Sequence, residues 1–284
     1  MPGLKIVTDS TCDLPLDIVK ELDIRVIPLF INIGQEGYLD GVDITREEFY
    51  NRLPSYNPPP KTATPGIEVF RKVYQELAEE GAEEILSIHI SESLSATVNV
   101  ARAAAEEYTQ IPVHVLDSDQ LSLGTGFLVE MSARAARMGK RFKDIKEQLK
   151  DQISRSHVFA AIDTLEYLRR GGRMNSVIAG IGTLIKMKPI LKMHAGVPSS
   201  EQVRTSNGAY KRLLELLYEK MPLEKIALVH THADDKAREL LAKVKRQLPE
   251  GPILSVDITP VLGTHLGPGA IGFACVSAQE PELK

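Results

Sequence analysis

Cysteine is scarce in this chain of 284 residues. Only Cys12 and Cys275 are present, and neither lies in a Cys-x-x-Cys or mixed Cys/His spacing. We therefore expect no disulfide framework, no structural zinc site, no bound metal and no cofactor. Cysteine usage of this kind is typical of a reducing compartment, and we expect a cytoplasmic protein.

Long hydrophobic runs and an excess of one charge are also missing. No apolar run approaches the roughly 18 residues that a membrane span needs, and the N-terminus lacks the layout of a signal peptide. Lys plus Arg number 34 and Asp plus Glu 38, so the net charge is −4. Without a basic stripe we expect no nucleic-acid partner, and at most transient contact with a membrane. Basic residues gather at 169–173 and 186–192, which suits one anion or one acidic partner.

Several signatures of catalysis and nucleotide binding are absent. No Gly-x-x-x-x-Gly-Lys-Ser/Thr occurs, and no Gly-x-Gly-x-x-Gly follows the first strand; these motifs carry phosphate-binding and dinucleotide-binding loops. The sequence also has no Gly-x-Ser-x-Gly elbow and no His-Glu-x-x-His. We therefore predict no nucleotide site and no catalytic residue.

Strands and helices alternate in the first half of the chain, which predicts a doubly wound, mainly parallel sheet with its site at the carboxyl ends of the strands. A proline-rich loop at 54–65 interrupts this pattern, because such a run suits neither a helix nor a central strand. The expected strands are residues 4–8, 25–33, 85–90 and 113–116, and the expected helices are 15–22, 45–53, 66–80, 95–108, 123–138 and 142–153.

The second half changes character, because neighbouring extended segments there can pair antiparallel. We predict an α/β protein of two domains, a doubly wound domain over residues 1–154 and an α+β domain over 155–284. A glycine-rich loop is expected at 263–269. The expected strands are residues 158–162, 189–193, 197–204, 226–231, 253–258 and 271–276, and the expected helices are 165–170, 175–185, 209–220 and 234–247.

The most informative segment is 91–97, where a buried strand runs into a hydroxyl-rich turn before a helix. A helix N-terminus has unpaired N–H groups and a partial positive charge, so hydroxyls there can form a small anion site. The same hydroxyls, Ser93, Ser95 and Thr97, can also cap the helix. Both interpretations stay open from the pattern alone.

Three further residues are candidates for ligand contacts. Thr62 lies on the rigid proline-rich loop and has no local duty, whereas Thr64 before Pro65 is expected to cap the next helix. His265 can donate to a carboxylate or simply bond to loop backbone. A helix C-terminus attracts cations, which accounts for Arg169 and Arg170 at the end of the expected helix. Arg173 lies beyond a Gly-Gly turn, where this explanation is weaker, and arginine can bind a carboxylate or phosphate.

Several motifs resemble, in the right order over nearly the whole chain, the DegV family, the fatty-acid-binding subunits of bacterial fatty acid kinase. The segments that carry the resemblance are Ile-Val-Thr-Asp-Ser at 6–10, Leu-Ser-Ala-Thr at 94–97, Asp-Ser at 117–118, Asp-Thr-Leu-Glu-Tyr-Leu at 163–168 with Gly-Gly-Arg at 171–173, Gly-Thr-Leu at 182–184, Lys-Pro-Ile-Leu at 188–191 and His-Leu-Gly-Pro-Gly at 265–269.

The resemblance implies two α/β domains with a long-chain fatty acid, such as palmitate or oleate, buried between them. It implies a carboxylate held by Thr62 and Ser95 with His265 nearby, and phosphotransfer or partner contacts for Arg173 and Arg204. It further implies that this chain is not itself an enzyme and that an ATP-dependent fatty acid kinase subunit is its partner.

The chain departs from the family pattern around both hydroxyls. Ala63 and Thr64 replace Ser and Gln, and Ala96 replaces the Gly that follows Ser95. Thr62 and Ser95 themselves are retained, so these departures bear on chain-length preference more than on the class of ligand.

Two other functions are compatible with the residues. One is a stand-alone enzyme on a small acidic or phosphorylated metabolite, with Asp9, Asp117, Ser95 and Arg173 in one polar cleft. The other is a regulatory interaction protein in which a bound lipid only fills space. A polar, solvated cleft instead of an apolar tunnel would favour the enzyme.

Overall fold

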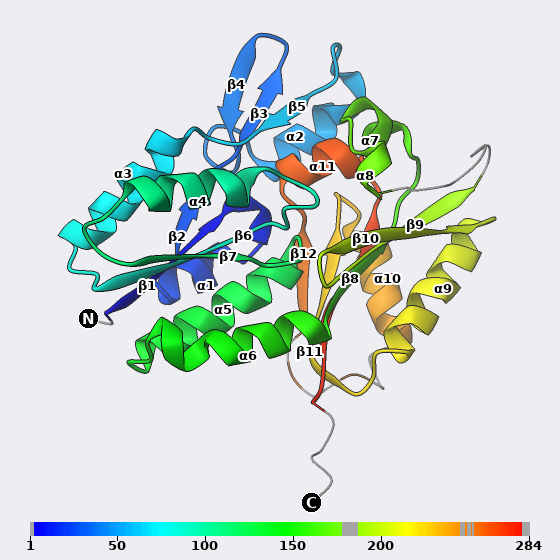
Figure 1. The fold of residues 1–284 in the computed structure, drawn as a ribbon. Helices are drawn as coiled ribbons and strands as arrows, with labels where there is room; N and C mark the ends of the chain where they lie inside the picture. The colour runs from blue at the N-terminus through cyan, green and yellow to red at the C-terminus, as the bar shows by residue number, and fades with distance from the viewer. Residues whose placement is uncertain (1–2, 178–186, 245–247, 249–250, 252, 280–284) are drawn as a thin grey trace, which may run out of the picture.

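The structure, a computed structural model, describes residues 3–177, 187–244, 248, 251 and 253–279 (Figure 1). The first sheet has the order β2-β1-β6-β7 and is parallel throughout. Helices pack on both of its faces, which confirms the predicted doubly wound sheet. Its strands are β1 (Leu4–Asp9), β2 (Arg25–Ile27), β6 (Glu84–His89) and β7 (Val113–Asp117); α3 (Ile67–Glu79) and α4 (Thr97–Glu107) cover one face, and α1 (Leu16–Glu21) and α5 (Leu123–Arg137) the other.

The second sheet has the order β10-β9-β8-β13-β11-β12, and only β11 and β12 pair in parallel. Helices α9 and α10 pack on one face, while the other face packs on α5 and α6. The predicted antiparallel pairing is confirmed. The elements are α6 (Phe142–Arg155), β8 (Ser156–Ala161), β9 (Lys188–His194), β10 (Val197–Val203), α9 (Ser206–Tyr218), β11 (Leu223–His230), α10 (Asp234–Val244), β12 (Leu254–Asp257) and β13 (Ile271–Ser277).

A small third sheet was not expected from the sequence. Strands β3 (Phe30–Ile33), β4 (Glu36–Leu39) and β5 (Lys61–Ala63) pair antiparallel in the order β4-β3-β5. The single strand predicted at 25–33 is therefore wrong, because β2 and β3 belong to different sheets. The proline-rich loop also contains β5, since Lys61–Ala63 lies between Pro60 and Pro65 and has N–H groups that can pair.

Short helices lie above the second sheet, near β5 (Figure 1). The loop predicted at 263–269 begins inside helix α11 (Pro260–Leu266), which Pro260 opens in the first turn. Of the helix predicted at 175–185, α8 (Met174–Val177) is described and the rest lies outside the described residues. The remaining elements are η1 (Ser10–Cys12), α2 (Arg46–Arg52), η2 (Leu53–Ser55) and α7 (Glu166–Arg170).

The two halves of the chain share one hydrophobic core. The sheets change between Arg155 and Ser156, next to the predicted boundary, but a single cluster of buried side chains includes both Leu4 and Val276. The division into domains 1–154 and 155–284 stays a prediction. In the part of the chain that the structure describes, no helix is long and apolar enough to cross a membrane.

Candidate functional site

A mostly apolar cavity of about 190 Å³ lies where the two halves of the chain meet. One water needs only roughly 10–15 Å³ of such space, so the cavity has room for a larger ligand. Aliphatic side chains from both halves form most of its wall. These include Leu29, Ile90 and Leu94 from the first half and Val158, Leu191 and Met193 from the second.

Polar side chains, including Thr11, Ser122 and Lys192, also line this cavity. Four of the five predicted site residues line the cavity, namely Thr62, Ser95, Arg173 and His265. The fifth, Arg204, is exposed just after β10 and does not line it. The structure therefore brings the predicted hydroxyls together with Arg173 and His265, and leaves Arg204 on the surface.

Thr62 and His265 form a direct pair across the cavity wall. Pairing with Ile31 of β3 orients Thr62, and its Oγ1 lies 2.9 Å from Nε2 of His265 in the last turn of α11. Burial, together with the positive charge of Arg173, lowers the pKa of His265 to about 4, so the ring is neutral at pH 7. Nδ1 of His265 has no partner among the described residues.

We assign the hydrogen of the neutral His265 ring to Nε2, because a buried N–H without an acceptor is costly. An N–H on Nδ1 would lack an acceptor, whereas an N–H on Nε2 donates to Thr62 Oγ1. With its oxygen accepting from His265, the Thr62 hydroxyl keeps its own hydrogen for a ligand. A carboxylate can accept this hydrogen, because an ionised carboxylate only accepts.

Ser95 belongs to a second hydroxyl group on the same wall. The Thr97 Oγ1 lies 2.9 Å from Ser95 Oγ and 3.0 Å from Thr64 Oγ1. The N-cap of α4 is Ala96, which makes no side-chain cap, whereas Ser95 Oγ accepts from the N–H of Thr97 in the first turn at 3.4 Å. Ser95 therefore supports the start of the helix and can also contact a ligand. Ser93 turns away to Ser91 Oγ.

Thr64 also lines the cavity, and the prediction that it caps the next helix is wrong. The N-cap of α3 is Gly66 and not Thr64, whose hydroxyl contacts Thr97 and faces the cavity wall instead. Thr64 lies two residues beyond Thr62 in an extended segment, where alternate side chains share a face. That spacing is the signal that could have identified it.

Arg173 lies beside the turn that carries Ser95, where it contacts a backbone carbonyl. Its Nε donates to the carbonyl oxygen of Leu94 at 2.9 Å. Among the described residues no carboxylate pairs with it, whereas Arg169 and Arg170 both pair with Glu166, as expected for a helix end. The outer nitrogens of the Arg173 guanidinium can therefore bind an anion near Ser95.

The acidic strand ends do not form a polar cleft. Asp9 is completely buried and accepts from the backbone of Thr11 and Ile90. Asp117 accepts from the N–H groups of Glu92 and Asp119. Both act as caps and turn formers, and neither lines the cavity that contains Ser95 and Arg173.

The chemistry of the cavity is that of a binding site for an amphipathic acid. Hydroxyls, a neutral imidazole and one guanidinium can stabilise an anionic head group, and the aliphatic wall suits an apolar tail. In the described part of the chain, no cluster of three His, Cys, Asp or Glu side chains could hold a metal ion.

The sequence and the fold match known proteins over nearly their full length. The profile of the DegV family, whose members are described as uncharacterised, matches residues 3–278. A DegV domain-containing protein of Halalkalibacterium halodurans is 32% identical over 278 residues, covering 96% of this chain and 98% of that protein.

Two solved structures have the same fold. A DegV family protein from Thermus thermophilus, described for its fatty acid binding, is 32% identical with a TM-score of 0.88, covering 97% of this chain and 99% of that one. DegV of Bacillus subtilis, described as a fatty acid binding protein, is 29% identical with a TM-score of 0.88, covering 97% and 100%. The chain therefore belongs to the DegV family.

Proposed function

We propose that this protein binds a long-chain fatty acid, such as palmitate or oleate, in the cavity between two domains, residues 1–154 and 155–284. Thr62 and Ser95 hold the carboxylate, and His265 orients the Thr62 hydroxyl. The observation that carries the proposal is that Thr62, Ser95, Arg173 and His265 all line one mostly apolar cavity. The fatty acid binding of the Thermus thermophilus and Bacillus subtilis relatives supports the same class of ligand.

The energetics favour a fatty acid over a small polar metabolite. Each buried CH₂ contributes about 0.8 kcal/mol, so a sixteen-carbon tail contributes of order 10 kcal/mol before the entropic cost of binding. A buried carboxylate is costly unless donors surround it. Thr62, Ser95 and Arg173 supply such donors, whereas Asp9 and Asp117 are occupied elsewhere and leave the stand-alone enzyme without its acid–base pair.

The role that we propose for the bound acid is presentation to a separate kinase subunit. That subunit, with ATP and Mg²⁺, would transfer a phosphoryl group to the carboxylate and form an acyl phosphate. Arg173, beside Ser95, neutralises negative charge at the reacting carboxylate. Arg204 is exposed and contacts the kinase, so this chain needs no catalytic residue of its own.

Extraction and mass spectrometry test the binding proposal. The organic extract of the purified protein should contain one long-chain fatty acid per chain, and calorimetry on delipidated protein should show binding of palmitate or oleate. A protein that carries no fatty acid and binds neither acid would refute the proposal.

Reconstitution with a purified bacterial fatty acid kinase subunit tests presentation. Acyl phosphate should form only when this protein, its fatty acid, ATP and Mg²⁺ are all present. Arg204→Gln should slow the reaction with unchanged fatty acid affinity, because Arg204 lies outside the cavity. If the protein binds fatty acid but no kinase accepts it, only the presentation role is wrong.

A further inference from the structure

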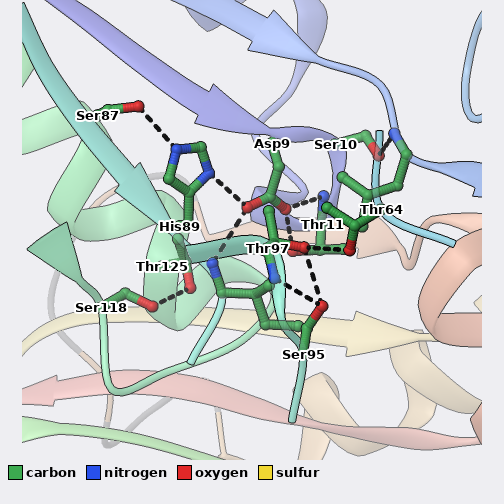
Figure 2. Close-up of polar contacts among 12 residues, drawn as sticks. Asp9, Ser10, Thr11, Thr64, Ser87, His89, Ser95, Thr97, Ser118 and Thr125 are labelled. Atoms are coloured by element: carbon green, nitrogen blue, oxygen red, sulfur yellow. Dashed lines mark hydrogen bonds and ion pairs between the residues drawn. The ribbon is translucent and has the colours of Figure 1, made fainter. Parts of the chain in front are cut away.

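Four buried side chains are connected by hydrogen bonds, and Figure 2 shows the part from Ser87 through His89 to Asp9. The Tyr74 hydroxyl donates to Ser87 Oγ at 3.0 Å, Ser87 Oγ lies 2.7 Å from His89 Nε2, and His89 Nδ1 lies 3.0 Å from Asp9 Oδ2. All four side chains are completely buried. They connect helix α3 to the carboxyl ends of β6 and β1.

The order serine, histidine, aspartate is that of a hydrolytic triad, but this arrangement cannot attack a substrate. A nucleophile must reach the scissile carbonyl, and none of Ser87, His89 and Asp9 lines the cavity or is exposed. The Ser87 oxygen also accepts from Tyr74. The residues therefore have a role other than nucleophilic catalysis.

Asp9 is the last residue in this series of hydrogen bonds, and its side chain is an ionised carboxylate. Burial by itself raises the pKa of Asp9, but donors from His89, Thr11 and Ile90 outweigh burial and lower it. A charged Asp9 fixes the hydrogen positions. His89 donates from Nδ1, Ser87 donates to His89 Nε2, and Tyr74 donates to Ser87, so every group has a partner.

Side-chain oxygens of Asp9 and Ser10 accept hydrogen bonds from residues of the cavity wall. Asp9 accepts from the backbone N–H of Ile90 at 3.1 Å and of Thr11 at 3.0 Å. The neighbouring Ser10 Oγ accepts from the N–H of Leu29 at 3.2 Å. Thr11, Leu29 and Ile90 come from three separate segments, and all three line the cavity.

We infer that the buried pair Asp9–His89 consists of positioning residues for the fatty acid cavity, which hold Thr11 and Ile90 in the wall while Ser10 holds Leu29. The inference rests on the proposed function. The strand that His89 ends also leads directly into the turn that carries Ser95, so the same pair fixes the base of that turn. A carboxylate with several donors from two strands permits little movement between them.

Replacement of His89 tests this role. His89→Leu removes the donor to Asp9 and should weaken palmitate binding about tenfold, which is within the coupling that neighbouring residues show. His89→Asn places an amide N–H near the position of Nδ1 and should restore most of the affinity. Affinity is measured per folded chain by calorimetry, with circular dichroism as the check on folding. Ser132→Ala, which removes a buried hydroxyl that does not line the cavity, should bind like the wild type.

A double-mutant cycle separates positioning from general stability. If His89 acts by holding Ile90, then His89→Leu should cost less affinity when Ile90→Ala is already present. If His89→Leu does not fold, Ser10→Ala, which removes the side-chain acceptor for the Leu29 N–H, should still weaken binding a few-fold. Wild-type affinity in both His89→Leu and Ser10→Ala, or full additivity with Ile90→Ala, would overturn the inference. A wild-type protein without fatty acid binding would instead refute the proposed function.

Discussion

Thr62 Oγ1 and His265 Nε2 lie 2.9 Å apart although 203 positions separate the two residues in the chain. The contact joins β5 of the small sheet to the last turn of α11. It brings two segments that are far apart in the sequence into one polar site. Its geometry and the surrounding packing lead to four predictions.

Loss of both carboxylate hydroxyls should weaken fatty acid binding strongly. Each hydrogen bond to a charged group contributes about 1.5–3 kcal/mol, so Thr62→Ala with Ser95→Ala should raise the Kd for palmitate by at least about a hundredfold. Calorimetry measures the affinity. Unchanged affinity in the folded double variant would mean that the carboxylate binds elsewhere.

A methyl group at position 171 should displace His265. An ideal Cβ there would lie 2.2 Å from His265 Nδ1, closer than any real contact. We expect Gly171→Ala to move the ring from Thr62 and to weaken palmitate binding about tenfold, because the Thr62 hydroxyl is no longer oriented. Gly66→Ala is the matched control, since nothing lies within 4 Å of its added Cβ. Equal affinity in the two variants would contradict this role for His265.

The buried carboxyl of Asp40 should make stability depend on pH. Burial raises the pKa of Asp40 to about 7, so the folded chain keeps a proton that the unfolded chain releases at a lower pH. Stability from this group therefore falls as the pH rises from about 4 to about 7. Asp40→Asn should remove the penalty and raise the free energy of unfolding at pH 8 by up to about 4 kcal/mol.

The comparison for Asp40 must be made at each pH between variant and wild type. Burial lowers the pKa of His157 to about 3 and that of His265 to about 4. Both histidines therefore destabilise the folded protein as the pH falls below the ordinary pKa of histidine. They act in the opposite direction but are shared by both proteins. Urea unfolding should show a gain for Asp40→Asn that is larger at pH 8 than at pH 5. Asp17→Asn, at an exposed position, is the matched control for replacing a carboxylate with an amide.

Tyr50 should stabilise the entry to α11. Its hydroxyl is buried and donates to the carbonyl oxygen of Ile258 at 2.9 Å, just before the helix begins. Tyr50→Phe leaves that carbonyl without its donor and should lower the free energy of unfolding by about 1–2 kcal/mol. Tyr38→Phe removes a hydroxyl whose contact with Glu36 is exposed, and should change it by less than about 0.5 kcal/mol. An equal effect of both changes would show that the Tyr50 contact contributes nothing specific.

Much of the fold could be predicted, because its elements have local signals. The amphipathic spacing of α3 and the apolar runs of β1 and β6 are visible in short windows of sequence. The third sheet could not be predicted in this way. Its strands are three or four residues long and acquire stability only by pairing with segments far away in the chain.

Part of the candidate site was also accessible from the sequence. The hydroxyl-rich turn around Ser95 follows a buried strand, and Thr62 has no local partner, so both could be named as candidates. The helical position of His265 and the contact of Thr64 with Thr97 could not, since they depend on where α11 and β5 pack.

Four properties can be read from the amino-acid sequence: the α/β class, the hydroxyl-rich turn at a strand end, the absence of nucleotide and metal motifs, and the resemblance to the DegV family. Three contacts are visible only in the folded chain: Thr62 with His265, Arg173 with Leu94 beside Ser95, and His89 with Asp9. The fold likewise places Arg173 in the cavity wall and Arg204 outside it. The reason is physical. Local patterns record which face of an element is buried, whereas these contacts depend on the packing of elements that are distant in the chain.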